Sequence, residues 1–133
     1  QEAEVAVPIA SGRKAVEEYG ALVRQHGMHV NVPTEIRFSG ADDVFLSPGY
    51  KEDVCYIGGY NAIYMEGDTF YELFCSDLES RYGARRHWGK MAPPNRAIAL
   101  RTFPGFPQFE EVRREFDPDG VFANAYIREL FAL

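Results

Sequence analysis

Residues 30–48 read Val-Asn-Val-Pro-Thr-Glu-Ile-Arg-Phe-Ser-Gly-Ala-Asp-Asp-Val-Phe-Leu-Ser-Pro, and their first half predicts a β-strand. Apolar and polar side chains alternate from Val30 to Phe38, which places them on opposite faces of a strand. The apolar face holds Val30, Val32, Ile36 and Phe38, and the polar face holds Asn31, Glu35 and Arg37. A solvent-facing pair of Glu35 and Arg37 would contribute little to stability. The alternative is that the two charges face a ligand, and this stretch alone favours the surface pair.

Length and composition describe one packed domain. The chain has 133 residues, of which 46% are hydrophobic and 14% aromatic, so a globular core is expected. The formal charge of -6 argues against nucleic acid as a partner. No apolar run is long enough for a membrane span, and no signal-peptide pattern is visible, so the compartment is left unknown. The chain begins with Gln rather than Met, which we take as a sign of a processed or excised piece.

The two cysteines, Cys55 and Cys75, fall in a predicted strand and a predicted helix. They lack the CxxC spacing of redox motifs and zinc sites, so no metal is expected. The default interpretation is two buried thiols, which weakly favours a reducing compartment.

The first ninety residues predict an α+β fold. Strands are expected at 2–7, 30–38 and 54–65, with a short extended piece at 85–88. Helices are expected from a Ser11 cap to about residue 26, and from an Asp68 cap over 69–82. This order predicts a split β-α-β arrangement, a mixed or antiparallel sheet with helices on one face. The paired glycines Gly58 and Gly59 suggest a bulge or a close backbone approach.

The last forty residues differ in character. Residues 91–107 contain four prolines and predict a long connection that leaves the sheet. A short helix over 108–116, a turn at 117–120 and a last helix capped by Asn124 follow. This proline-rich, mainly helical tail is amphipathic, so we expect it to dock on something beyond the first ninety residues.

Residues 85–90, Arg-Arg-His-Trp-Gly-Lys, form a basic cluster in an acidic chain. One interpretation is a basic surface turn. However, Trp88 and Gly89 within the cluster indicate burial and close packing. A lysine held there could donate to an oxyanion or to an electron-rich cofactor. No Ser-His-Asp order, HExxH, P-loop or GxGxxG motif occurs.

Four groups of residues carry a resemblance to a known family. Thr34–Phe38, followed by Asp42-Asp43 and Leu46-Ser47-Pro48, resembles the Glu-x-Arg and Leu-Ser-Pro pattern of the sugar-lactone oxidases. That family contains L-gulonolactone, D-arabinonolactone and galactonolactone oxidoreductases, with alditol oxidases as relatives. Residues 83–90 are similar to its Gly-x-Arg-Pro-His-Trp-x-Lys signature, with Arg86 in place of proline. Residues 116–126 resemble its C-terminal ending, and 53–56 resemble the animal L-gulonolactone oxidases.

The resemblance implies a flavoenzyme of the vanillyl-alcohol-oxidase type. In such enzymes a substrate (cap) domain covers an FAD that a separate domain holds. The implied activity is oxidation of a carbinol of a sugar-1,4-lactone by hydride transfer to flavin, with oxygen or another electron acceptor. The matching positions imply Arg37, Lys90 and Glu35 as catalytic residues, Glu35, Tyr60 and Gly58 as substrate-binding residues, and Arg37, Lys90 and His87 as cofactor-binding residues. His87 is expected to be structural rather than a base.

The family's FAD domain has no counterpart in these residues, so the resemblance implies only the C-terminal part of such an enzyme. We expect residues 1–90 to be a portion of the cap, and 91–133 to pack on a flavin-binding domain or chain. The preferred hypothesis is a catalytic cap that works with that partner, and it predicts Glu35, Arg37 and Lys90 converging on one pocket. The alternative is a non-catalytic α+β binding or interaction module. It predicts that Glu35 and Arg37 pair on an exposed surface, with the tail folded back on the sheet.

Overall fold

The computed structural model describes residues 2–27, 32–60, 68–91 and 93–133, without the side chains of 68–71. Its strands are β1 (Glu2–Pro8), β2 (Glu35–Ser39), β3 (Val54–Tyr60) and β4 (Arg85–Arg86). Its α-helices are α1 (Gly12–Gln25), α2 (Asp68–Tyr82), α3 (Arg96–Thr102), α4 (Phe106–Phe116) and α5 (Ala125–Phe131). Residues 30–31 and 61–65 of the predicted strands lie outside the described residues.

The strands form one sheet in the order β2-β3-β1-β4, and all neighbours are antiparallel. Since β3 lies between β1 and β2, the β1-α1-β2 unit is split by a strand that comes later in the chain. The predicted split β-α-β arrangement and the α+β fold class are therefore confirmed.

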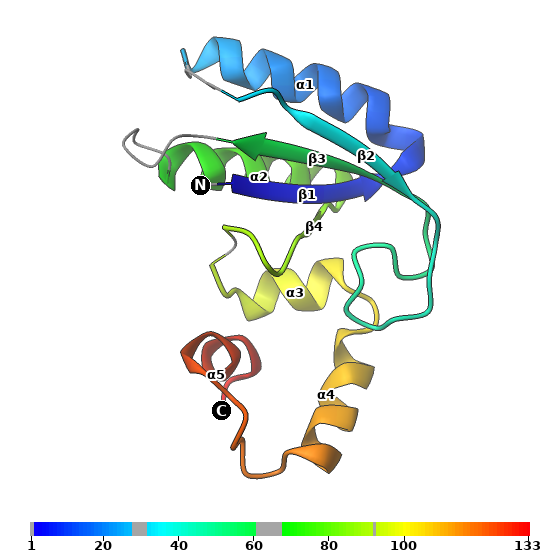
Figure 1. Cartoon of the computed structure of the whole chain (residues 1–133), viewed down its shortest axis with the longest axis vertical. Coiled ribbons are helices and arrows are strands. Elements are labelled where there is room, and N and C mark those ends of the chain that lie inside the picture. The colour runs from blue at the N-terminus through cyan, green and yellow to red at the C-terminus, as the bar shows by residue number, and fades with distance from the viewer. Residues whose placement is uncertain (1, 28–31, 61–67, 92) are drawn as a thin grey trace.

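One face of the sheet carries the main core. Helices α1 and α2 cover this face (Figure 1). Val5 of β1 and Ile57 of β3 are buried in one cluster with residues of both helices. Tyr19 of α1 meets Phe74 of α2 with ring centroids 5.0 Å apart. The other fully or nearly fully buried members are Ala3, Val7, Ala15, Cys55, Cys75, Leu78 and Ala84. Alternation along β1 and β3 then places every second residue on the opposite face, away from the helices.

The tail builds a second core below β4, at the other end of the molecule (Figure 1). Phe106 of α4 stacks on Phe131 of α5 at 4.9 Å. Trp88 joins this cluster, with its ring 4.6 Å from that of Phe103, and Leu46 packs against it from the loop after β2. The basic cluster (residues 85–90) and the loop at residues 42–50 therefore connect the sheet to the tail.

Helix α3 is the main element that the sequence prediction missed. It lies within residues 91–107, which were expected to form a connection without a helix. Pro93 and Pro94 precede the helix rather than interrupt it, and Asn95 caps it by accepting a hydrogen bond from the Ile98 amide at 3.0 Å. Prolines just before a cap do not break a helix, so reading them as helix breakers was wrong.

Three local predictions are also corrected. Ser11 makes no capping hydrogen bond because it ends a 3-10 turn, Ile9–Ser11, that leads directly into α1. Gly58 and Gly59 pair in regular register with β1, so of the two predicted alternatives the bulge is wrong, whereas Gly58 does pack closely against another group, the Tyr60 side chain. Phe38 was expected on the buried apolar face, but it is 68% exposed on β2, an edge strand of the sheet.

The cap at Asn124 is confirmed, since its side chain accepts a hydrogen bond from the Ile127 amide at 2.9 Å. Both cysteines are free and buried, as predicted. In the part of the chain that the structure describes, no group of His, Cys, Asp and Glu side chains could hold a metal ion. None of the described helices is both long and apolar enough to cross a membrane.

Candidate functional site

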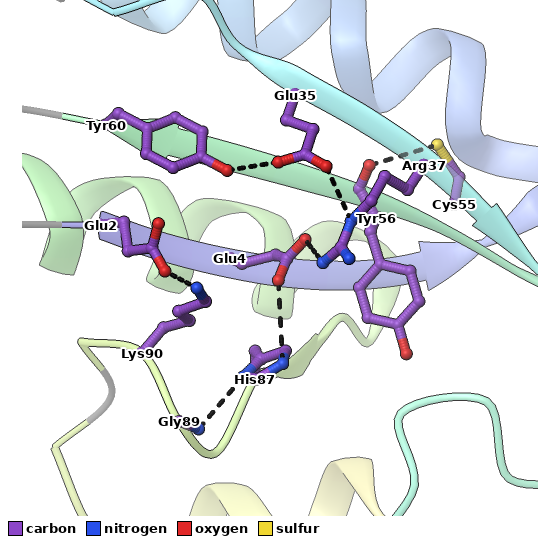
Figure 2. A network of polar contacts seen from close by, with 10 residues as sticks. All are labelled: Glu2, Glu4, Glu35, Arg37, Cys55, Tyr56, Tyr60, His87, Gly89 and Lys90. Atoms are coloured by element: carbon purple, nitrogen blue, oxygen red, sulfur yellow. Dashed lines mark hydrogen bonds and ion pairs between the residues drawn. The ribbon is translucent and has the colours of Figure 1, made fainter.

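The sheet face away from α1 and α2 gathers charged side chains from three strands. The register places Glu35 of β2 opposite Gly58 of β3, and Gly58 opposite Glu4 of β1. Arg37 and Tyr56 pair one repeat further along. Because these positions alternate with the core positions, their side chains project together on the face away from α1 and α2 (Figure 2).

Arg37 lies at the centre of this network. Its Nη2 donates a short hydrogen bond to Oε1 of Glu4, and its Nε lies 3.2 Å from Oε1 of Glu35. The guanidinium carbon is 5.3 Å from the ring centroid of Tyr56. The hydrogen bond to Glu4, with the charges of both carboxylates, raises the pKa of Arg37 further. The side chain is 49% exposed, and Nη1 has no protein partner among the described residues.

Glu4 is a functional candidate that the sequence reasoning missed. Its side chain is only 3% exposed, and Oε2 is buried without a hydrogen-bond partner in the described structure. Nε2 of His87 lies 3.9 Å from Oε2. The signal was present in the sequence: Glu2 and Glu4 alternate with Ala3 and Val5, so the glutamates occupy the face opposite the core.

Glu35 also accepts a hydrogen bond from the Tyr60 hydroxyl, 2.5 Å from its Oε2. This bond, with burial and the charge of Glu35, raises the pKa of Tyr60 to about 12. Gly58 leaves room for the arrangement, because a Cβ there would lie 3.3 Å from the Tyr60 ring. The predicted substrate-binding residues Glu35, Tyr60 and Gly58 are therefore neighbours.

Residues 87–91 run beside β1. The amides of His87 and Met91 donate to the backbone oxygens of Glu4 and Glu2, each at 2.9 Å. The Lys90 ammonium forms an ion pair with the Glu2 carboxylate. Lys90 therefore lies on the same side of the sheet as Arg37, but it is held by a different carboxylate (Figure 2).

His87 is constrained by its neighbours. Its Nδ1 accepts a hydrogen bond from the Gly89 amide at 3.0 Å. A neutral imidazole with an accepting Nδ1 carries its proton on Nε2, which faces Glu4. His87 is thus held by the Gly89 amide at Nδ1 and lies beside the Glu4 carboxylate at Nε2.

The three predicted catalytic residues thus make two separate contacts: Glu35 pairs with Arg37, and Lys90 pairs with Glu2. Glu35 and Arg37 form a half-exposed pair, as the interaction-module hypothesis predicted. The tail does not lie on this sheet face, contrary to that hypothesis, since its helices pack into the second core. An open groove of about 330 Å³ beside the network is lined by Arg37, Phe38, Ser39, Tyr56 and His87. Neither Glu35 nor Lys90 lines it.

Comparison with known proteins identifies the family. The model of the D-arabinono-1,4-lactone oxidase family matches residues 1–130. The chain belongs to this family. It is 36% identical over 129 residues to an L-gulono-1,4-lactone dehydrogenase of Mycobacterium tuberculosis, a match that covers 97% of this chain and 30% of that relative. It is 33% identical to the L-gulonolactone oxidase of Scyliorhinus torazame, over 95% of this chain and 30% of that protein.

A shorter match of 35% identity to an alditol oxidase of a Streptomyces species covers 37% of this chain and 12% of that protein. These family members are oxidoreductases of aldonolactones and polyols by name, which confirms the resemblance seen in the sequence motifs. The chain spans about 30% of the length of the lactone oxidoreductases that it matches.

Proposed function

We propose that this chain is the substrate-domain part of an FAD-dependent aldonolactone oxidase or dehydrogenase. It would act on a carbinol of a sugar-1,4-lactone, the class that its relatives' names contain. The observation that carries the proposal is the half-exposed Arg37 guanidinium, which is held between Glu4 and Glu35 on the sheet face away from α1 and α2, with Nη1 free for a ligand.

The chemistry of this face fits the reactive edge of a flavin. Arg37 and Lys90 are cationic donors on one side of the sheet, suited to an electron-rich ring and to a developing alkoxide. Tyr56 adds an aromatic wall to the groove beside Arg37. We propose that Arg37 and Lys90 would hold the ring edge, with His87 supporting them. A bound FAD would supply the acceptor for the hydride that leaves the carbinol carbon.

The other roles follow from the contacts. Glu35 accepts a hydrogen bond from Tyr60 and lies against Arg37, so its carboxylate can also accept from substrate hydroxyls while it orients the guanidinium. Tyr60, whose ring lies over Gly58 because that residue has no Cβ, would shape the substrate side of the site. Arg37 would donate a hydrogen bond from Nη1 to the substrate hydroxyl oxygen as that hydroxyl gives up its proton to water, which stabilises the negative charge on the oxygen in the transition state.

The flavin itself would be held mainly by a domain or chain outside these residues. We propose that residues 1–90 are a portion of the cap and that the tail, 91–133, packs on that flavin-binding partner. An apolar groove of about 340 Å³ between α4 and α5 supports this, since Phe116 and Phe122 at its rim are 77% and 86% exposed.

The test starts with a visible absorption spectrum and the intact masses of every chain in the isolated protein. Flavin bands together with a flavin-binding partner are the expected result. Stopped-flow reduction of that flavin by L-gulono-1,4-lactone should then slow by about two to three orders of magnitude in Arg37→Met and Lys90→Met, the size of effect seen when a charge-stabilising donor is removed. A colourless sample that contains only this chain would support a non-catalytic interaction module instead.

A further inference from the structure

We propose that the two glutamates of β1 are positioning residues, Glu4 for Arg37 and Glu2 for Lys90, which together set the separation between the two cations. This inference rests on the proposed function in assigning the cations a role toward ligand. Its structural part concerns only contacts within this chain.

The spacing comes from the strand. Glu2 and Glu4 are two residues apart on one face of β1, so their Cα atoms are separated by about 7 Å. Each carboxylate holds a cation from a different element: Arg37 comes from β2, and Lys90 from the segment after β4. The distance between the cations is thereby tied to the repeat of a strand that is hydrogen-bonded on both sides.

The backbone of β1 reinforces the same arrangement. The carbonyl oxygens of Glu4 and Glu2 accept the amides of His87 and Met91, so residues 87–91 are fixed at both ends against this strand. Lys90 lies between the two residues that make these hydrogen bonds, His87 and Met91, and the Glu2 carboxylate orients its ammonium group. The main chain of both glutamates and the side chain of Glu2 thus act on the Lys90 segment.

The burial of Glu4 favours positioning over stability. A buried ion pair is weak evidence for stability, because desolvation offsets the attraction. Here the carboxylate is 3% exposed, whereas its guanidinium partner is 49% exposed. The fixed anion therefore lies inside and the cation reaches outward. With Nη2 bound to Glu4 and Nε beside Glu35, the plane of the guanidinium is set and Nη1 faces away from both carboxylates.

Glu79 provides a matched control. It is another buried carboxylate, 3% exposed, and it binds the Arg86 guanidinium through two hydrogen bonds. However, it lies on α2, on the helix-covered side of the sheet. Glu79→Gln therefore removes a comparable buried charge without touching Arg37 or Lys90.

The first experiment follows guanidinium and ammonium groups by NMR in this chain. Glu4→Gln should speed rotation of the Arg37 guanidinium by about tenfold or more, the effect of losing a charged hydrogen bond. Glu79→Gln should leave Arg37 unchanged and free Arg86 instead. Glu2→Gln should speed hydrogen exchange at the Lys90 ammonium. Unchanged Arg37 rotation in Glu4→Gln, or unchanged Lys90 exchange in Glu2→Gln, would overturn that part of the proposal. Because Glu2 is a third exposed, its variant is informative even if Glu4→Gln does not fold.

The second experiment measures flavin reduction in the flavin-containing enzyme. Displaced cations should slow reduction by about a hundredfold in Glu4→Gln, with the flavin still bound. Normal reduction by folded Glu4→Gln, where Arg37→Met is inactive, would refute positioning but leave the proposed function intact. Normal reduction by Arg37→Met itself would refute the proposed function, while the NMR result would still decide the contacts.

Discussion

The Arg85 guanidinium donates a hydrogen bond from Nη1 to the backbone oxygen of Pro48 over 2.8 Å. The same nitrogen reaches the oxygen of Tyr50 at 3.0 Å, and Nε reaches that of Thr102 at 2.8 Å. Arg85 is 8% exposed, and burial lowers its pKa. One buried cation thus joins the sheet, the 42–50 loop and α3. The Trp88 indole adds a bond to the Leu46 oxygen at 2.8 Å, so two of the family-like motifs contact each other.

Arg85→Met should therefore destabilise the fold by about 3–5 kcal/mol, because three carbonyl oxygens, the one of Thr102 in a buried contact and those of Pro48 and Tyr50 in partly buried ones, lose a charged donor at once. Urea unfolding followed by circular dichroism measures the change. Arg101→Met, an exposed position on α3, should change stability by less than about 0.5 kcal/mol. Equal effects of the two substitutions would show that Arg85 does not hold these parts together.

Gly105→Ala should destabilise the tail by about 1–3 kcal/mol through overpacking. An added Cβ would lie 2.5 Å from the backbone oxygen of Phe45 and 2.7 Å from its Cα, and backbone atoms cannot move aside as a flexible side chain can. Thermal unfolding measures the loss.

Gly20→Ala serves as the opposite control in the same assay. Gly20 lies inside α1, and its added Cβ would meet only the flexible end of Arg24 at 3.4 Å. Alanine is the better helix former, so a gain of about 0.5–1 kcal/mol is expected. If Gly20→Ala destabilised the protein and Gly105→Ala did not, the close packing of Gly105 against Phe45 would be contradicted.

The Tyr60 hydroxyl should titrate at about pH 12 while Glu35 is intact. A pKa raised in the folded state means that the Glu35–Tyr60 bond stabilises the fold fully below the ordinary tyrosine pKa of about 10, and is lost as the pH rises through 12. In Glu35→Gln the pKa of Tyr60 should fall toward 10, as shown by tyrosinate absorbance with Tyr60→Phe subtracted. An unchanged titration curve would mean that Glu35 does not hold the hydroxyl.

Both thiols should resist a water-soluble thiol reagent at neutral pH. Burial raises the pKa of Cys75 to about 12 and also raises that of Cys55, so the reactive thiolate is scarce, and each side chain is 1% exposed. Absorbance of the released chromophore should show no reaction in the native protein and reaction of both cysteines in urea. Rapid labelling of the native protein would contradict the packing around α2 and β3.

The sequence predicted the elements whose signal is local. The alternation in β1 and β3 and the helical spacing in α1 and α2 arise from residues close in the chain. The seven-residue α3 was missed because it offers barely two turns of pattern and follows prolines. In the site, the proximity of Glu35 and Arg37 follows from one strand, but the Glu4–Arg37 contact depends on the register of β1, β3 and β2. Such pairing across three strands is non-local, and periodicity in one strand cannot specify it.

Phe116 and Phe122 provide the last test, because their exposure separates a docking surface from a core. Phe116→Ser and Phe122→Ser should each change the stability of this chain by less than about 0.5 kcal/mol, since both side chains already contact water. Phe106→Ser, at a fully buried position of the second core, should lower the free energy of unfolding by about 3–5 kcal/mol. If the tail packs on a flavin-binding partner, the exposed substitutions should abolish co-purification of that partner while the fold survives. Retention of the partner by the Phe116→Ser, Phe122→Ser double variant would exclude this surface and leave the groove between α4 and α5 without that role.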